Sequence, residues 1–460
     1  MMNWNSLYSP RRTGDPEQKT RNTDHTRNSY MRDYDRIIFS SAFRRLQNKT
    51  QVFPLPGPVF VHNRLTHSLE VASVGRSLGK TAGEYIAARH PDASEDFREF
   101  YRHELASVIA AGCLAHDIGN PPFGHSGEDA IRAFFSELGG EARRQIQDQL
   151  SANQWLDFEK FEGNSNAFRT LTHNYNEPED GGYRLTYTTL ASIIKYPCTS
   201  EKGFNKTLGI ANKKSGFFDS EIGTYTSIAR TLGIPQKGDC SYARHPFVYL
   251  VEAADDICYR VIDLEDAQRL NIISLDQFKA LLLPFFEDSG DYNSRKNIEE
   301  KLQRITDPNQ QAQFIRANWI GLMIGKLCRL FLEQETALLS GSLDKDLLAC
   351  LPEAQLALIK EINRFSYENI YNHKSVVEIE ITGFHIIGDL LKDFIHAVLH
   401  PGSAKSEKLL QLIPPQFPIQ QEQPLYLRIQ SVVDYIAGMT DLFAIDLYRK
   451  MTGISITRFG

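Results

Sequence analysis

The sequence predicts an all-α protein, with additional C-terminal helices on a helical core and at most a small β-hairpin. Apolar residues recur at helical spacing, strand patterns are sparse, and no repeat of solenoid period is present. A chain of 460 residues with 42% hydrophobic residues can bury a large core. We therefore expect a polar N-terminal arm at 1–36, a core at 37–280, and a C-terminal helical region at 281–460 packed on that core.

The first half begins with a segment that has no helical periodicity. Residues 1–36 form either a poorly ordered arm or an arm packed on the body or on a neighbouring subunit. A helix is expected at 37–51, and prolines at 54–58 end it. A long amphipathic helix follows at 66–88. The nearly continuous apolar run at 105–116 predicts a buried core helix, with a buried strand as the alternative.

The remaining elements are also predicted to be mainly helical. Further helices are expected at 247–267, 315–337, 347–371, 386–399 and 427–451. Residues 183–190 alternate as a short hairpin arm would, although 188–196 suits a helix equally well. The polar stretches at 200–219 and 401–424 predict loops.

Composition narrows the function classes. A net charge of -6 argues against wholesale coating of nucleic acid or membrane, but it allows a local basic pocket. The six cysteines lie far apart with no CxxC pair, which suits a reducing compartment. No stretch approaches the ~20 apolar residues that cross a bilayer, and no apolar signal segment is present. We expect a cytoplasmic protein without a membrane partner.

The pair His116-Asp117 is the most informative feature of the chain. It ends an apolar run and adjoins Gly119 and Pro121, so the helix should stop at this pair. Adjacent His and Asp can place a nitrogen and an oxygen on one divalent metal. Such a metal acidifies bound water enough for attack on phosphorus near neutral pH.

Two other segments fit the same centre. His67 alone would more often be a core residue than a ligand. Asp255 and Asp256 interrupt an apolar helix, where an unpaired carboxylate is costly and coordination relieves the cost. Consecutive helix residues point about 100° apart, so one of the two should face the site. The mixed nitrogen and oxygen set suits Mn, Fe, Mg, Zn or Co.

A second pair of polar residues has two interpretations. His125 and Glu128 lie three residues apart, where the carboxylate can support the imidazole for acid–base catalysis. They also suit a helix start, with His125 or Ser126 as the N-cap and Glu128 in the first turn. The two interpretations are compatible.

Asp255, Tyr259 and Asp263 are spaced four and four, which places them on one helix face. A tyrosine on such a face is usually core, but acids on both sides favour a polar pocket. Asp263 can accept a hydrogen bond from a sugar hydroxyl, and the ring of Tyr259 can pack against the sugar. Several basic residues can offset phosphate charge, although each alone is more often a surface charge: Lys195, Lys213, Lys214, Arg64 and Arg260.

Together these residues resemble the HD-domain superfamily and, within it, the deoxyguanosine triphosphate triphosphohydrolase (dGTPase) family. The matching segments are 43–47, 50–52, 64–71, 116–128, 161–164, 195–197, 252–257 and 434–441. The HD signature alone is specific only to the superfamily. The block at 116–128 together with Ala-Ala-Asp-Asp at 253–256 and Gly-Met-Thr-Asp at 438–441 is specific to the dNTPase family.

The resemblance implies roles for individual residues. The metal ligands would be His67, His116, Asp117 and Asp255, with Asp255 preferred over Asp256 because Tyr259 and Asp263 follow it at the family's spacing. His125 and Glu128 match the catalytic pair, in which His125 protonates the leaving 5′-oxygen or orders the attacking water.

The same resemblance implies substrate contacts. Gln51 and Asp263 match contacts to the sugar 3′-hydroxyl, and Tyr259 is placed to exclude a 2′-hydroxyl. Triphosphate contacts are implied for Arg64, Asn120, Lys195 and Lys214, and Arg428 is a weaker candidate for a base contact. Asn164 is carried over for the α-phosphate, but Gly163 and Asn166 replace residues that are His and Gln in some subfamilies.

The implied activity is metal-dependent hydrolysis of deoxynucleoside triphosphates, with dGTP preferred, to the deoxynucleoside and inorganic triphosphate. The implied cofactor is Mn, Mg or Fe. A homo-oligomer, often a hexamer in this family, and a nucleotide or single-stranded DNA effector are also implied. The alternatives are another HD-type phosphohydrolase, such as a nucleotide phosphodiesterase or alarmone hydrolase, or a non-catalytic HD regulator that binds nucleotide or nucleic acid.

Overall fold

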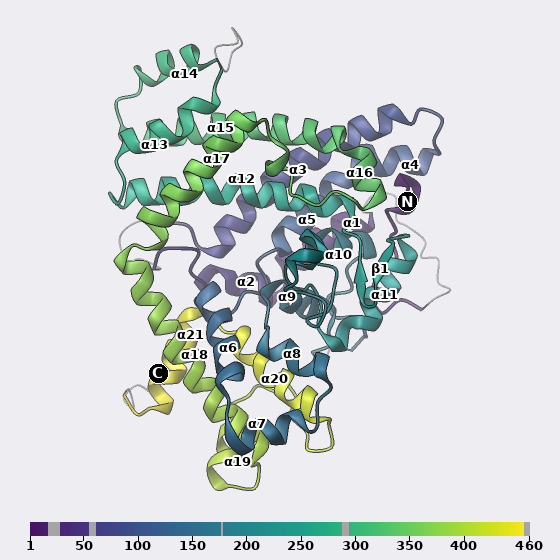
Figure 1. Ribbon diagram of the computed structural model, residues 1–460, viewed down its shortest axis with the longest axis vertical. Helices are drawn as coiled ribbons and strands as arrows, with labels where there is room; N and C mark the ends of the chain where they lie inside the picture. Colours follow the sequence, from purple (N-terminus) through teal and green to yellow (C-terminus); the bar gives the residue numbers. More distant parts are fainter. Residues whose placement is uncertain (17–27, 55–60, 176–177, 288–293, 455–460) are drawn as a thin grey trace.

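The computed structural model describes residues 1–16, 28–54, 61–175, 178–287 and 294–454. Figure 1 shows that these residues form a largely helical molecule, as the sequence predicts. The sheet in the described part of the chain has two short antiparallel strands, β1 (Gln236–Gly238) and β2 (Ser241–Tyr242). None of the helices described is long and apolar enough to cross a membrane.

The helices of the first half supply most of the site. They are α1 (Ser29–Ile38), α2 (Ser41–Arg45), α3 (Arg64–Arg89), α4 (Glu95–Glu99), α5 (Leu105–Ala115), α6 (His125–Glu137), α7 (Gly140–Gln147), α8 (Ala152–Glu159), α9 (Gly163–Thr172), α10 (Tyr187–Ile193), α11 (Ile222–Thr231) and α12 (Pro246–Arg269). Short 3-10 and π-helical turns precede or connect them: η1 (Trp4–Ser6), η2 (Leu46–Asn48), the π-helical η3 (Phe100–Glu104), η4 (Lys206–Leu208), η5 (Ile210–Asn212) and η6 (Asp219–Glu221).

The second half continues as helices. They are α13 (Leu275–Leu282), α14 (Arg295–Leu302), α15 (Pro308–Glu333), α16 (Glu335–Ser340), α17 (Glu353–Ser366), α18 (Lys374–Leu399), α19 (Ala404–Gln411), α20 (Leu425–Ala437) and α21 (Asp441–Met451). The turns η7 (Leu283–Phe285), η8 (Leu348–Cys350) and η9 (Tyr367–Tyr371) connect some of them.

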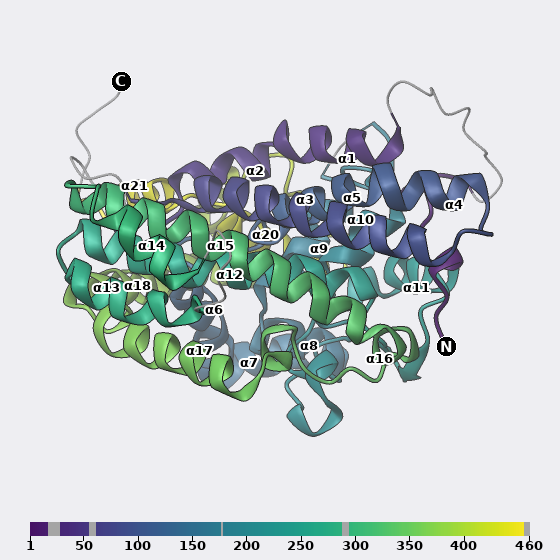
Figure 2. The same ribbon diagram turned by 90° about the horizontal axis from the view of Figure 1, so that it is seen from above.

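Two hydrophobic clusters hold these helices together. The first surrounds α3, α5, α12 and α15, which occupy the upper part of Figure 1 and run alongside one another in Figure 2. The second joins α6 and α8 to the C-terminal helices α18, α20 and α21, with Phe135 and Phe158 in the same cluster as Phe394 and Tyr435. Burial of apolar side chains on both sides therefore fixes the C-terminal helices against the segment that follows His116.

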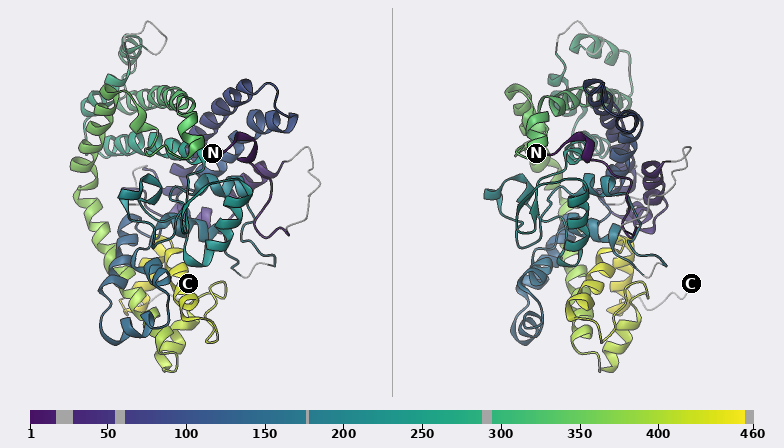
Figure 3. Two further views of the ribbon diagram at one scale, coloured as in Figure 1. Left: turned by 45° about the vertical axis from the view of Figure 1, so that its right-hand side comes forward. Right: turned by 90° about the vertical axis from the view of Figure 1, so that its right-hand side faces the viewer.

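The chain passes between the two clusters along one edge of the molecule. Figure 3 shows the green segment from α17 to α18 descending this edge. The boundary predicted at residue 280 falls inside α13, and helices beyond it contribute to both clusters. The C-terminal region thus supplies side chains to both halves of the interior.

The N-terminus packs on the body over its first sixteen residues. Trp4 stacks on Phe247 with ring centroids 6.3 Å apart, and its indole Nε1 donates to Glu335 at 2.6 Å. Helix α1 begins at Ser29, inside the segment that was expected to lack helical structure. The remainder of the predicted arm, 17–27, lies outside the described residues.

Some predicted elements were wrong. The single helix expected at 37–51 is divided, because the Ser40 hydroxyl accepts the Phe43 N–H and starts a new helix. Of the two alternatives at 183–196, the helix forms and the hairpin arm does not, because the Thr186 hydroxyl caps α10 by accepting the Thr189 N–H. The helix expected at 427–451 is likewise divided before Thr440, which caps α21.

Candidate metal centre and substrate pocket

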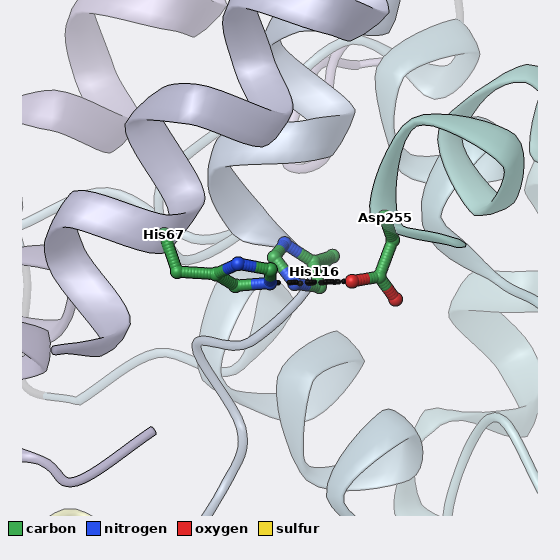
Figure 4. A group of neighbouring side chains, drawn as sticks. All are labelled: His67, His116 and Asp255. Atoms are coloured by element: carbon green, nitrogen blue, oxygen red, sulfur yellow. Dashed lines mark hydrogen bonds and ion pairs between the residues drawn. The ribbon is translucent and has the colours of Figure 1, made fainter. Parts of the chain in front are cut away.

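Three side chains from three helices converge on one point (Figure 4). His67 lies on α3, His116 directly follows α5, and Asp255 lies on α12. Asp255 Oδ1 is 3.3 Å from His67 Nε2 and 3.4 Å from His116 Nε2. The three ligand atoms lie within 4.8 Å of one another, close enough to share one cation.

The position of His116 fits a metal ligand. Its Nδ1 lies 2.7 Å from the Cys113 carbonyl, which fixes the ring so that Nε2 is directed at the cluster. This Nε2 is buried and has no hydrogen-bond partner in the described part of the chain. Coordination would satisfy the nitrogen, and two imidazoles with one carboxylate suit Mn, Fe, Mg or Zn.

The two other acids near this point have different partners. Asp117 Oδ1 lies 3.6 Å from His116 Nε2, but it also accepts the Asn120 amide at 2.5 Å. Asp117 Oδ2 accepts Arg64 Nη1 at 2.7 Å. Asp117 therefore borders the cluster of three with both oxygens already hydrogen-bonded. Asp256 is not part of the cluster of three and pairs with Arg260 at 2.7 Å.

Electrostatics keep the carboxylates of Asp255 and Asp117 ionised. Burial alone would raise the pKa of Asp255, but Lys195 at 3.0 Å and His116 hold it well below its usual value. Burial also acts on Asp117, and Arg64 outweighs it, so the pKa of Asp117 is lowered. Anionic oxygen is the form that a divalent cation needs.

A pocket of about 490 Å³ opens beside the cluster. Its walls include Thr50, Gln51, Val52, Arg64, His67, Asp117, Phe123, Gly124, His125, Ser126, Asp255, Asp256, Tyr259, Asp263, Tyr371, Val376, Ile379 and Glu380. A volume of this size suits a nucleotide-sized ligand. Gln51 Oε1 is buried here without a hydrogen-bond partner among the residues described, so it is free to accept a bond from a ligand.

The side of the pocket that η9 and α18 form was not predicted from the sequence. The Tyr371 hydroxyl donates to Asp263 Oδ2 at 2.7 Å, and its ring stacks on Tyr259 with centroids 6.4 Å apart. Val376, Ile379 and Glu380 of α18 complete this side. No spacing signal in the sequence relates these residues to α12, because long-range packing alone brings them there.

His125 is the first residue of α6 and lies exposed at the pocket. Gly124 precedes it with φ +61°, and a Cβ at this glycine would lie 2.5 Å from Arg64 Nη2. Desolvation, followed by the charges of Arg64 and Lys214, lowers the pKa of His125. A neutral imidazole at pH 7 can accept a proton.

Glu128 is buried behind His125. Its Oε1 accepts the Gly163 N–H at 2.8 Å, and its Oε2 has no hydrogen-bond partner among the described residues. A Cβ at Gly163 would lie 2.4 Å from Glu128 Oε1 and 2.5 Å from Asn120 Oδ1. Glycine at 163 therefore leaves room for both side chains.

Three of the residues predicted to contact phosphate, Asn164, Lys195 and Lys214, are hydrogen-bonded to carboxylates of the protein. Asn164 and Lys214 both donate to Glu162 Oε1, at 2.7 and 2.9 Å, beside the buried Glu128. These two residues and Lys195 are outside the lining of the 490 Å³ pocket. Arg428 lies apart from the site and lines a different cavity.

Asp441 connects two segments of the pocket. Its carboxylate accepts the N–H of Thr50 at 2.8 Å and the N–H of Phe123 at 2.9 Å. Gln51 follows the first of these residues, and Gly124-His125 follows the second. Asp441, the first residue of α21, thus fixes the segments that carry Gln51 and His125 relative to each other.

Comparison with known proteins agrees with this geometry. The HD domain model matches residues 64–204, and the phosphohydrolase-associated domain model matches residues 349–450. The first range contains His67, His116 and His125, and the second contains Tyr371.

Full-length relatives are similar throughout the chain. A deoxyguanosinetriphosphate triphosphohydrolase-like protein of Synechocystis sp. is 38% identical, over 99% of this chain and 100% of the relative. A protein of the same name from Pseudomonas aeruginosa strain PAO1 is 39% identical, over 99% of each chain. A deoxyguanosinetriphosphate triphosphohydrolase of Yersinia pseudotuberculosis is 30% identical, over 91% of this chain and 92% of the relative. The chain therefore belongs to the deoxyguanosinetriphosphate triphosphohydrolase family of HD-domain proteins.

Proposed function

We propose that this protein is a metal-dependent hydrolase that converts deoxynucleoside triphosphates into the deoxynucleoside and inorganic triphosphate. The observation that carries the proposal is the adjacency of two features in one pocket. The His67–His116–Asp255 cluster suits a divalent cation, and Gln51, Asp263 and Tyr371 present polar atoms beside it. The names of the relatives point to dGTP as the preferred substrate.

The chemistry that a bound divalent cation supplies is activation of water near neutral pH and polarisation of a phosphate oxygen. His67, His116 and Asp255 would hold the cation, with Asp117 as a fourth ligand or as an acceptor that orients Arg64 and Asn120. We propose Mn, Mg or Fe as the native ion, since all three accept mixed nitrogen and oxygen ligands.

His125 is the proposed acid–base residue. It lies at the pocket with a lowered pKa, so it can take a proton from water and return it to the leaving 5′-oxygen. Glu128 would position this segment through its bond to Gly163. Arg64, Lys195 and Lys214 would offset charge on the phosphates, and Asn120 and Asn164 would donate hydrogen bonds to them.

The sugar end is proposed to lie against α12 and η9. Gln51 and Asp263 would bond the 3′-hydroxyl, because Gln51 Oε1 is unpaired and Asp263 is held in place by Tyr371. Tyr259, stacked on Tyr371, would leave no room for a 2′-hydroxyl. We further propose a cytoplasmic homo-oligomer, with a hexamer as the expected form and a nucleotide or single-stranded DNA as effector.

The test is a panel of the four dNTPs, singly and mixed, with Mn or Mg, with and without single-stranded DNA. Products are separated by chromatography. Intact triphosphate with deoxynucleoside supports the proposal, and GTP should remain uncleaved. Pyrophosphate or monophosphate would indicate another HD-type phosphohydrolase. Nucleotide binding without turnover under every condition would indicate a regulator.

A further inference from the structure

A second cavity lies on the other side of the metal-bearing segment. It has a volume of about 100 Å³ and is lined by residues that include Arg45, Lys49, Asn166, Thr170, Tyr175 and Tyr183. This volume is well below the roughly 300–1,000 Å³ typical of sites for drug-sized ligands, so the cavity suits an ion rather than a nucleoside.

The cavity is rich in hydrogen-bond donors. Arg45 bonds the Ser41 hydroxyl at 3.3 Å, and no carboxylate of the described residues lies within ion-pair distance of it. Lys49 is 2% exposed and donates to the Asn120 and Ala437 carbonyls at 2.5 and 3.0 Å. An ammonium group has three N–H donors, so the third can donate to a bound anion.

Hydroxyl groups add to this set, and the acid that lines the cavity, Asp434, is paired with Arg169, which also pairs with Glu221 at 2.7 Å. The cavity is lined by Tyr175 and Tyr183, whose hydroxyls have no hydrogen-bond partner among the described residues. Asp434 accepts Arg169 Nε and Nη2 at 2.8–2.9 Å and Gln430 at 3.2 Å. Lys49 is buried and Arg45 is half-buried, and burial followed by the charge of Arg45 lowers the pKa of Lys49 to about 7. Burial of a cation is costly unless an anion or polar groups compensate for lost hydration.

Two lining residues hold consecutive carbonyls of the segment that follows the metal ligands. Asn166 Nδ2 donates to the Gly119 carbonyl at 2.7 Å, and Lys49 donates to the Asn120 carbonyl. Asn120 in turn bonds Asp117. An ion in this cavity would therefore act on groups that position the metal-bearing segment.

We propose that this cavity binds a tetrahedral phosphate-class oxyanion through Arg45, Lys49 and Tyr175, and that the bound anion stabilises the segment at 116–120. Arg45 supplies charge-assisted bonds, Lys49 supplies its remaining N–H, and Tyr175 supplies a neutral donor. The source of the anion is either free inorganic phosphate or the phosphate of a nucleotide, which share this chemistry.

The experiment measures binding of radiolabelled orthophosphate to the full-length, metal-loaded protein by equilibrium dialysis. Arg45→Leu should weaken the Arg45-dependent site by about 10- to 100-fold, the scale of losing hydrogen bonds to a charged group. Arg44→Leu is the matched control, because Arg44 is exposed over Phe39 and outside the cavity. Arg45→Lys should retain more of the binding than Arg45→Leu, and Tyr175→Phe should weaken it without changing charge.

Selenate-soaked crystals locate the site independently of the variants. An anomalous peak between Arg45 and Tyr175 supports the proposal, and a peak confined to the metal pocket overturns it. A second dialysis uses dGMP: tighter Arg45-dependent binding of dGMP than of phosphate identifies a nucleotide source, and the reverse identifies the free ion. Equal binding by the Arg45→Leu and Arg44→Leu proteins overturns the proposal. No readout depends on hydrolysis, so failure here leaves the proposed activity intact.

Discussion

The two walls of the pocket are built differently. In the catalytic wall, defined as His67, His116, Asp255 and His125, the first three side chains contact one another between core helices, and His125 follows a segment that bonds Asp441. The recognition wall, defined as Gln51, Tyr259, Asp263 and Tyr371, combines segments from both halves of the chain.

The difference separates two requirements of the site. The catalytic wall needs ligand atoms within a few ångströms of one point, and the packed helices α3, α5 and α12 provide that precision. The recognition wall is proposed to contact the sugar, and η9 of the C-terminal region supplies its Tyr371. Changes in the catalytic wall should therefore act on the chemical step, and changes in the recognition wall on discrimination among substrates.

The largest effect is expected for His125→Ala. The variant should retain the metal and bind nucleotide while kcat falls by about 10²- to 10⁴-fold, the scale of removing an acid–base group. Stopped assays of triphosphate release, with metal content measured on the same sample, test this. His103→Ala is the control, because His103 is an exposed histidine outside the pocket. Equal rates for the two variants would contradict an acid–base role for His125.

An intermediate effect is expected for Gly163→Ala. The new Cβ would displace Glu128 and Asn120, and displacement by about 1 Å can reduce a rate by up to about 10²-fold. Metal content should stay constant, and the free energy of unfolding should fall by at most about 1–3 kcal/mol. Gly223→Ala is the matched control, since nothing lies within 4 Å of a Cβ there. An unchanged kcat would show that catalysis does not depend on the positions of Glu128 and Asn120 beside Gly163.

The smallest effect is expected for Tyr371→Phe in the recognition wall. Loss of one hydrogen bond should lower kcat/KM for dGTP by about 2- to 10-fold with little change in metal binding. Tyr371→Phe also affects Asp263, because burial raises the pKa of Asp263 to about 7 and the Tyr371 bond opposes this rise.

The dependence of kcat/KM on pH tests whether ionised Asp263 binds the sugar. If ionised Asp263 accepts the 3′-hydroxyl, kcat/KM rises as pH increases through about 7, and Tyr371→Phe moves the inflection upward. Dideoxy-GTP, which lacks the 3′-hydroxyl, should lose this inflection. Identical profiles for dGTP and dideoxy-GTP would contradict the assignment of Asp263 to the sugar.

The sequence predicted the catalytic wall better than the recognition wall for a physical reason. His116 ends an apolar run and Asp255 interrupts an apolar helix. Burial of such polar groups is costly unless they are hydrogen-bonded, ion-paired or coordinated, so both residues stand out in the sequence. Tyr371 and Glu380 follow no such pattern, since their positions at the pocket depend on where η9 and α18 pack. The all-α class was predictable from periodicity, whereas helix boundaries at Ser40 and Thr186 depended on single capping bonds.

The central claim is that His67, His116 and Asp255 hold one divalent cation beside the pocket. Anomalous diffraction from manganese-soaked crystals of the full chain tests it most directly. The account predicts a single peak within bonding distance of His67 Nε2, His116 Nε2 and Asp255 Oδ1, absent from His116→Ala crystals. A peak elsewhere, or none at this point in the unmutated protein, would contradict it.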